Sequence, residues 1–171
     1  KFIQLCQNSN GELRYSVETE HYLCYHYNAF EFLDLFYYYE IINDKRIRIL
    51  LNKLAKFLSM GVTEIGSIKY DCFQTFPEVM YYSGAVGAAL ISAKSMGFKG
   101  CEEHIESAYN FLFENQKPDG SFISCRHAMP YIRKPIPYGL FTDERSYPRP
   151  LSYILQHLLI RVKSKKIIQR T

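Results

Sequence analysis

FLFENQKPDGSFIS, residues 111–124, decides the fold, because its pattern occurs three times along the chain. FIQLCQNSNGELRY (residues 2–15) and FLSMGVTEIGSIKY (residues 57–70) also place a Phe nine positions before a Gly and an apolar residue two positions after it. The marker glycines are Gly11, Gly66 and Gly120, so one period is 55 residues and the next is 54. A period of this length, with helical patterning between the marks, indicates a repeat of helical hairpins.

Apolar spacing between the marks predicts five helices, over residues 28–42, 45–60, 77–97, 101–115 and 150–163. Asn28 is placed to cap the first helix and Pro77 to open the third. Residues 12–17 and 67–72 alternate apolar and polar side chains, which is typical of short strands or turns. Residues 126–150 contain five prolines and predict a long irregular loop, and residues 164–171 form a basic tail. Residues 1–171 therefore read as one all-α domain of tandem helical hairpins, forming an α/α toroid or a partial arc of one.

Composition fits a single domain with a substantial core, since the chain has 171 residues and 47% hydrophobic content. It contains 15 Tyr and 12 Phe but no Trp, an excess that suits both helix contacts and an aromatic-lined cavity. The net charge is +4, and five basic residues lie in the last eleven positions, so the body is close to neutral. This distribution does not predict a nucleic-acid partner.

The five cysteines are odd in number, widely spaced and lack a C-x-x-C pair, which predicts reduced thiols and a cytoplasmic location. The sequence shows neither a signal peptide nor an apolar run long enough to cross a bilayer. The chain begins with Lys1, and its first residues match the end of a helix in the later repeats, as expected of a piece of a longer chain. An open repeat end would bury itself, so we expect a homo-oligomer or a contact with another portion of the same chain.

Residues 116–122, QKPDGSF, resemble the Q-x-x-D-G-S-W/F motif of the terpenoid cyclase and protein prenyltransferase repeats. Residues 7–11 are a weaker copy, and residues 62–66 keep only the glycine. Related turns occur across the α/α toroids, which include six-hairpin glycosidases, polysaccharide lyases and sugar epimerases. Residues 27–45 look more like the helices of these carbohydrate-active proteins. The resemblance implies a ring of about six hairpins, of which this chain supplies two whole ones and two partial ones.

In toroids of this kind the site is expected where the inner helices begin, which here means the segments between each marker glycine and the next helix. These segments should converge on one acidic and aromatic cleft. Acid–base chemistry on a sugar needs two groups with separated pKa values, and the candidates are His26, Tyr27, Asp71 and Glu78. Substrate-binding candidates, including arginines that can clamp a carboxylate or phosphate, are His21, Tyr25, Arg126, His127, Arg145 and Arg149. Helix capping and cross-hairpin pairing are the alternative at each position.

The sequence therefore favours a carbohydrate-active or sugar-binding domain, with glycosidase-, lyase- or epimerase-like chemistry on a sugar or uronate if it is an enzyme. One alternative is a non-catalytic helical-repeat scaffold that binds another protein. A second is an isoprenoid-handling enzyme, although the D-x-D-D acid of squalene-type cyclases is absent. No cofactor is predicted. Zinc remains an alternative, but Asp71 directly precedes Cys72 where the prenyltransferase site has D-x-C.

Overall fold

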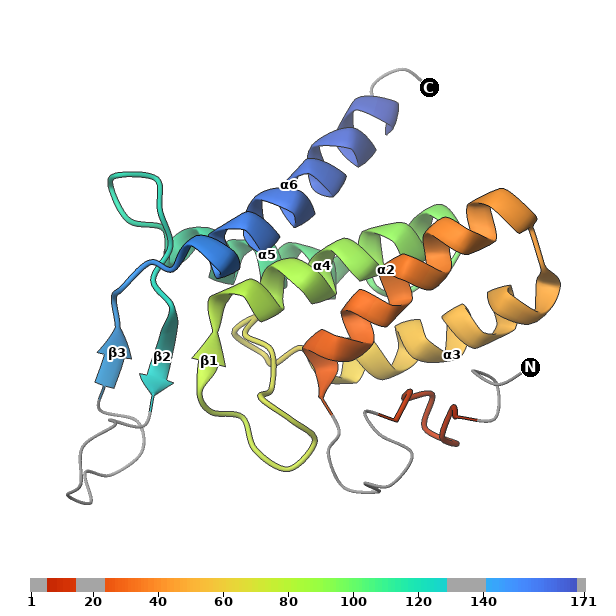
Figure 1. Ribbon diagram of the computed structural model, residues 1–171, viewed down its shortest axis with the longest axis horizontal. Helices are drawn as coiled ribbons and strands as arrows, with labels where there is room; N and C mark the ends of the chain where they lie inside the picture. Colours follow the sequence, from red (N-terminus) through yellow and green to blue (C-terminus); the bar gives the residue numbers. More distant parts are fainter. Residues whose placement is uncertain (1–5, 15–23, 129–140, 169–171) are drawn as a thin grey trace.

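The protein is mostly helical, with one small sheet, in a computed structural model that describes residues 6–14, 24–128 and 141–168. The helices in these ranges are α2 (Tyr25–Ile42), α3 (Lys45–Met60), α4 (Met80–Ser95), α5 (Glu102–Glu114) and α6 (Pro148–Ile168). α2, α4 and α6 run in the same general direction, and α3 and α5 return the chain (Figure 1). The predicted hairpins α2–α3 and α4–α5 are thus present, each followed by a marker-glycine segment.

The three glycine segments fold into the same turn. The N–H groups of Gly11, Gly66 and Gly120 each donate to the carbonyl three residues earlier, at 3.0, 2.9 and 2.9 Å. Their φ angles are +98°, +84° and +84°, in the left-handed region that glycine enters without a Cβ penalty. Each turn closes with a single antiparallel bridge, namely Gln7–Leu13, Val62–Ile68 and Gln116–Phe122. Within the described part of these alternating segments, residues 12–14 and 67–72, each segment contributes one such bridge and no longer strand.

Side chains explain the QKPDGS motif of the third turn. The Gln116 amide donates to the Gly120 carbonyl at 2.8 Å, and Asp119 accepts from the Ser121 N–H at 2.9 Å. The first turn repeats the first of these bonds, because the Gln7 amide donates to the Gly11 carbonyl at 2.9 Å. Such side-chain bonds to nearby backbone groups stabilise a turn that leaves the helical register.

Asn28 does not cap α2, which begins three residues earlier, at Tyr25. Its amide instead lies buried between α2 and the first glycine turn, where Oδ1 accepts from the Leu13 N–H at 2.7 Å and Nδ2 donates to the Leu13 carbonyl at 3.2 Å. Asn43 and Asp44 separate α2 from α3, as the predicted helix ranges require: Asn43 has a φ of +54°, and Asp44 accepts from the Arg46 N–H at 2.8 Å. A buried amide that pairs with both backbone groups of one residue holds the turn to the helix.

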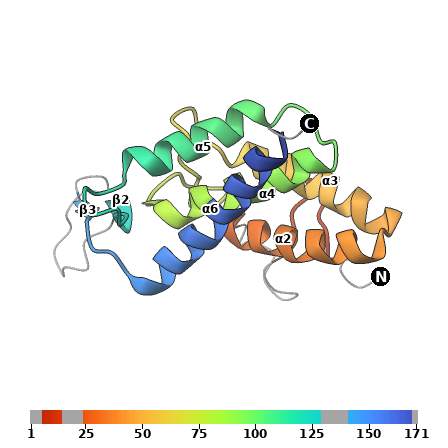
Figure 2. The same cartoon turned by 90° about the horizontal axis from the view of Figure 1, so that it is seen from above.

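α4 is the central helix and contacts α2, α3, α5 and α6. Figure 2 shows it between α2 on one side and α5 on the other, with α6 crossing it. It is rich in small residues, and a Cβ on Gly87 would lie 2.8 Å from the Tyr109 ring of α5. The small side chains therefore allow the close helix approach that offsets the roughly 1 kcal/mol cost of a mid-helix glycine.

The small sheet corrects the all-α prediction. β1 (Glu78–Val79) pairs with β2 (Cys125–Ala128), which pairs with β3 (Phe141–Asp143), and both pairings are antiparallel. Within the predicted irregular loop, residues 126–128 belong to β2 and residues 141–143 form β3. Its last residues are helical, because α6 starts at Pro148 and continues to Ile168. Residues 164–168 of the predicted basic tail are helical. Pairing at these positions satisfies backbone groups that an irregular loop would have to hydrogen-bond otherwise.

None of the described helices is both long and apolar enough to cross a membrane. All five cysteines fall within the described ranges, and all are free thiols.

Candidate functional site

Aromatic side chains from α2, α4 and α6 meet where these three helices begin. The His26 ring of α2 stacks on the Tyr82 ring of α4, with centroids 3.8 Å apart and planes 15° from parallel. Tyr81 meets His26 edge-on at 5.6 Å, and the Tyr81 ring lies 5.9 Å from that of Tyr153 on α6. Three helices that are far apart in the sequence therefore build one aromatic cluster.

His26 lies deep in this cluster, with only 3% of its surface exposed. Burial lowers its pKa to about 3, and burial also raises the pKa of the Cys24 thiol to about 11. His26 Nδ1 lies 2.6 Å from Cys24 Sγ, so a neutral imidazole can accept a hydrogen bond from the thiol. The predicted catalytic histidine is thus an uncharged, enclosed group that positions the surrounding rings.

Tyr27 and Arg149, both predicted site residues, are exposed at the rim of the cluster. Arg149 Nε donates to the Tyr153 hydroxyl at 2.9 Å, and the guanidinium carbon lies 5.7 Å from the centre of that ring. The hydrogen bond to Tyr153, with Tyr81 and Tyr27 nearby, raises the pKa of Arg149. Tyr81 and Tyr153 also belong to this cluster, although the sequence analysis did not select them. The excess of tyrosine was the signal that could have indicated an aromatic site.

An open groove of about 220 Å³ lies between α2 and α6. The Phe30 ring closes one part of it, 5.3 Å from Tyr153 and 5.7 Å from His157. Polar atoms come from Asp34 and Gln156. Its lining is Phe30, Leu33, Asp34 and Tyr37 from α2, and Tyr153, Gln156, His157 and Ile160 from α6. None of these residues was predicted, because their facing positions arise only when the two helices are packed.

His157 is the most buried polar group of this lining. Burial lowers its pKa to about 4, and its Nδ1 has no hydrogen-bond partner among the described residues. A groove with aromatic walls, one carboxylate and one amide can bind a ligand that has both apolar faces and hydroxyl groups.

Glu78, Arg126 and His127 form a second cluster, on the sheet. Glu78 is buried, and its Oε2 lies 3.3 Å from Arg126 Nε and 3.5 Å from His127 Nε2. The β1–β2 register places Glu78 opposite Arg126. His127 has a φ of +53°, and its ring lies 4.7 Å from that of Phe76. Three predicted residues are thus brought together at the start of α4, since β1 runs directly into that helix.

Two predicted residues lie elsewhere. Asp71 accepts bonds from the N–H groups of Phe73 and Gln74 at 2.7 and 2.9 Å, and its other oxygen accepts from the Gln74 amide at 3.0 Å. Tyr25 is buried and stacks on Phe57 of α3, with centroids 4.7 Å apart. Asp71 therefore organises a turn, and Tyr25 belongs to the core between α2 and α3. The predicted His21 lies outside the described residues.

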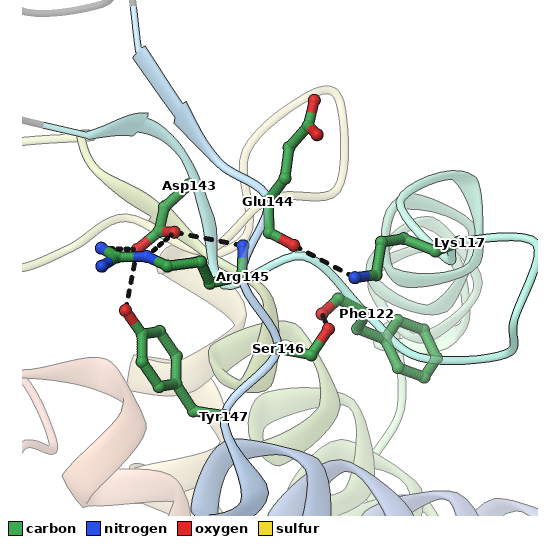
Figure 3. Close-up of polar contacts among 7 residues, drawn as sticks. All are labelled: Lys117, Phe122, Asp143, Glu144, Arg145, Ser146 and Tyr147. Carbon is green, nitrogen blue, oxygen red and sulfur yellow. Dashed lines mark hydrogen bonds and ion pairs between the residues drawn. The ribbon is translucent and has the colours of Figure 1, made fainter.

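Arg145 is held by its own segment (Figure 3). Its Nε and Nη2 donate to the two oxygens of Asp143 at 2.7 and 2.9 Å, and this pairing lowers the pKa of Asp143. Lys117 donates to the Glu144 carbonyl at 3.2 Å, and Ser146 donates to the carbonyl of Phe122 at 2.8 Å. These bonds fasten the segment between β3 and α6 to the third glycine turn.

The predicted site residues therefore form two groups rather than one. One group lies where α2, α4 and α6 begin, and it consists of His26, Tyr27 and Arg149. The other lies on the sheet, and it consists of Glu78, Arg126 and His127. Within the described ranges, no group of three or more His, Cys, Asp or Glu side chains is placed to hold a metal ion.

Comparison with known proteins concerns the fold. The chain is similar to the solved structure described as "Glycosyl hydrolase family 88 from Bacteroides vulgatus", with a TM-score of 0.69 over 95% of this chain at 12% sequence identity. It spans 53% of that chain. No protein-family profile and no curated protein sequence matches it. The likeness agrees with the six-hairpin glycosidase part of the resemblance and gives no support to the terpenoid cyclase or prenyltransferase part.

Proposed function

We propose that this chain is a carbohydrate-active or sugar-binding domain of the α/α-toroid type, which binds a saccharide in the groove between α2 and α6. The lining of the groove carries the proposal. Phe30, Tyr37 and Tyr153 supply aromatic surface, and Asp34 and Gln156 supply hydrogen-bonding groups between them. A sugar has matching features, since its C–H faces pack on aromatic rings and its hydroxyls need polar partners.

Each polar group has a distinct role in this proposal. The Asp34 carboxylate accepts hydrogen bonds from sugar hydroxyls, and the Gln156 amide both donates and accepts. Arg149 is exposed at the rim of the aromatic cluster and is always charged, so it can bind the carboxylate of a uronate. Its hydrogen bond to Tyr153 aligns the guanidinium with the wall of the groove.

Apart from the groove, which neither residue lines, the Glu78–His127 pair on the sheet is a separate candidate for acid–base chemistry. The buried Glu78 carboxylate lies 3.5 Å from His127 Nε2 and can orient the imidazole ring. Arg126 Nε lies 3.3 Å from the same carboxylate and balances its charge. Glycosidase-, lyase- and epimerase-like reactions all use such a proton-transfer group.

Adjacent tyrosines of α2 offer a matched test of the groove. Tyr37 lines it and is 48% exposed, whereas Tyr38 is 50% exposed and does not line it. Since the chain has no Trp, tyrosine fluorescence can report binding without a Trp background, and thermal shift gives a second readout. The panel contains neutral oligosaccharides, uronic acids and isoprenyl diphosphates. A ligand that binds only the folded state adds about 2.7 kcal/mol of stability at a hundred times its Kd.

We expect a saccharide to raise the melting midpoint. Tyr37→Ala should weaken its binding roughly tenfold, the effect of losing about 1.4 kcal/mol, and Tyr38→Ala should leave it unchanged. Equal losses in both variants would reject the groove as the site. A shift with diphosphates alone would replace the carbohydrate proposal with isoprenoid handling.

One observation favours the scaffold alternative. Leu155, Leu159 and Val162 of α6 form an exposed apolar stripe, and such stripes on a soluble protein commonly mark contact with another protein. If no compound of the panel binds, protein binding through this stripe becomes the leading function.

A further inference from the structure

The groove between α2 and α6 has a negatively charged wall. Of the described side chains that line it, Asp34 alone is charged at neutral pH, because burial lowers the pKa of His157 to about 4. Glu31 is exposed three residues before Asp34, and partial burial together with the Asp34 carboxylate raises its pKa. α2 contains neither Lys nor Arg, so no cation of this helix offsets the two acids.

The basic residues on the groove face of α6 lie beyond the two ends of the groove. Arg149 and Lys163 lie seven residues before and after Gln156, which is about 10.5 Å along the helix in each direction. That separation is about one Debye length at 0.1 M salt, so neither cation offsets the groove carboxylate at its middle. Arg161 is engaged with α5, where its Nη2 donates to Glu106 at 2.9 Å. The middle of the groove therefore repels a second anion.

His157 adds a hydrogen-bond donor to this lining. The residue is 1% exposed, and a Cβ on Gly84 of α4 would lie 3.6 Å from its Nδ1, so the Nδ1 edge of the ring faces α4. Nδ1 has no hydrogen-bond partner among the described residues. A buried N–H without an acceptor is costly, so we place the proton of the neutral ring on Nε2. Since Nδ1 faces α4, Nε2 belongs to the side of the ring that lines the groove.

We propose that the groove binds an uncharged sugar ring and rejects an acidic one, with His157 Nε2 donating to a sugar oxygen and Asp34 accepting from sugar hydroxyls. This selectivity rests on the proposed function, because it requires that the groove bind a saccharide. A neutral sugar offers both donors and acceptors, so it satisfies both groups while its C–H face packs on Phe30 or Tyr153. An acidic sugar in the same position would place its carboxylate near that of Asp34, and the two like charges repel.

Matched pairs of sugars test the charge selection. Methyl glucoside and methyl galactoside are each compared with the corresponding methyl uronide, which carries a carboxylate in place of the CH2OH group. Isothermal titration calorimetry at neutral pH and about 0.15 M salt measures each affinity. Binding is assigned to the groove when Tyr37→Ala weakens it. We expect the neutral member of a pair to bind in the groove at least roughly tenfold more tightly than the acidic member.

Variants of α2 and α6 separate the two polar groups. Asp34→Asn keeps a hydrogen-bonding side chain but removes the charge, so the two members of a pair should then bind within about threefold of each other. Glu40→Gln removes the same charge from α2 outside the groove and should leave the preference unchanged. His157→Leu should weaken binding of the neutral sugar roughly fivefold through loss of the donor, and His157→Gln, which retains an N–H, should lose less.

Circular dichroism establishes that each variant is folded. An acidic sugar that binds in the groove as tightly as its neutral counterpart overturns the proposed selectivity but leaves the groove as a saccharide site. A preference that persists in Asp34→Asn overturns it equally, because another group must then reject the acid. If neither member of any pair binds, the proposed function itself fails, and the selectivity fails with it.

Discussion

The second and third glycine turns have the same backbone but different neighbours. Gly66 and Gly120 share a φ of +84° and the same closing hydrogen bond of 2.9 Å. A Cβ on Gly66 would collide with the Ser107 carbonyl of α5, whereas a Cβ on Gly120 meets nothing within 4 Å in the described part of the chain. The first turn is like the second, because Gly11 lies against the Lys53 carbonyl of α3.

The backbone conformation of a turn and the elements that pack on it are therefore set independently. Local bonds form all three turns, but among the described residues helix backbone packs directly on the marker glycine only in the first two, from α3 and α5. The third turn is held instead by two side-chain hydrogen bonds to the segment before α6 (Figure 3). Lys117 of the turn donates to the Glu144 carbonyl, and Ser146 of that segment donates to the Phe122 carbonyl. The region around α4 is therefore a closed interior, and the α6 side is an open edge.

The largest expected contrast is between Gly66→Ala and Gly120→Ala. Both place an alanine at positive φ, which costs about 1–2 kcal/mol. Gly66→Ala adds a backbone collision that only movement of α5 can relieve, so we expect a loss of about 3 kcal/mol or more. Urea unfolding of the two variants measures the difference. Equal losses would show that the second turn is no more tightly covered than the third.

Acid should destabilise the closed interior through its two buried histidines. The folded-state pKa is about 3 for His26 and about 4 for His157, against 6.5 unfolded, so the unfolded chain binds more protons below pH 6.5. Stability is therefore complete above pH 6.5 and falls as the pH drops towards these values. At pH 5 each imidazole should cost about 2 kcal/mol.

Urea unfolding at pH 7.5 and pH 5 measures this slope. Phenylalanine keeps an aromatic ring but does not titrate. His26→Phe should therefore reduce the loss of unfolding free energy between pH 7.5 and pH 5 by the contribution of one histidine, about 2 kcal/mol. An unchanged slope in this variant would mean that His26 is solvated in the folded state. His157→Phe provides the same measurement on the α6 side.

Two glycines of α4 should respond in opposite directions to alanine. Gly84 has room, since its nearest neighbour is His157 Nδ1 at 3.6 Å, whereas a Cβ on Gly87 would press on the Tyr109 ring at 2.8 Å. We expect Gly84→Ala to stabilise the protein by about 0.5–1 kcal/mol through helix propensity. Gly87→Ala should destabilise it by about 1 kcal/mol or more through overpacking. Melting midpoints of the pair test this, and a gain in both would indicate a looser contact between α4 and α5.

The smallest effect belongs to the open edge. Leu155 is 61% exposed, so Leu155→Gln should change the unfolding free energy of the monomer by less than about 0.5 kcal/mol. Urea unfolding at low protein concentration measures this change. A loss comparable to that of an interior leucine would show that α6 is covered within the single chain.

The sequence predicted the repeat and the approximate bounds of the helices, because these depend on residues close together in the chain. It misread Asn28, whose amide pairs with Leu13 across a packing contact instead of capping a helix. It also missed the sheet, because a two-residue strand such as Glu78–Val79 has no periodicity of its own and forms only when β2 lies beside it.

The candidate site shows the same division. Local sequence correctly identified side chains able to exchange protons or bind anions in the two clusters, namely Tyr27, Arg149, Glu78 and His127. It grouped Asp71 and Tyr25 with them only because they lie in the same segments of the sequence. Asp71 turned out to satisfy the N–H groups of its own turn, which a carboxylate does at short range. The groove residues of α2 and α6 face each other only because both helices pack on α4.

By itself, then, the sequence determined the glycine turns and the helices between them, since φ preferences, side-chain bonds to nearby backbone and apolar periodicity are local properties. Tertiary structure alone decided which turn is sealed, which rings surround His26, and which side chains line the groove. These outcomes depend on close packing between elements more than a hundred residues apart, such as Phe30 and Tyr153. Their contact energy is gained only when the intervening chain has folded.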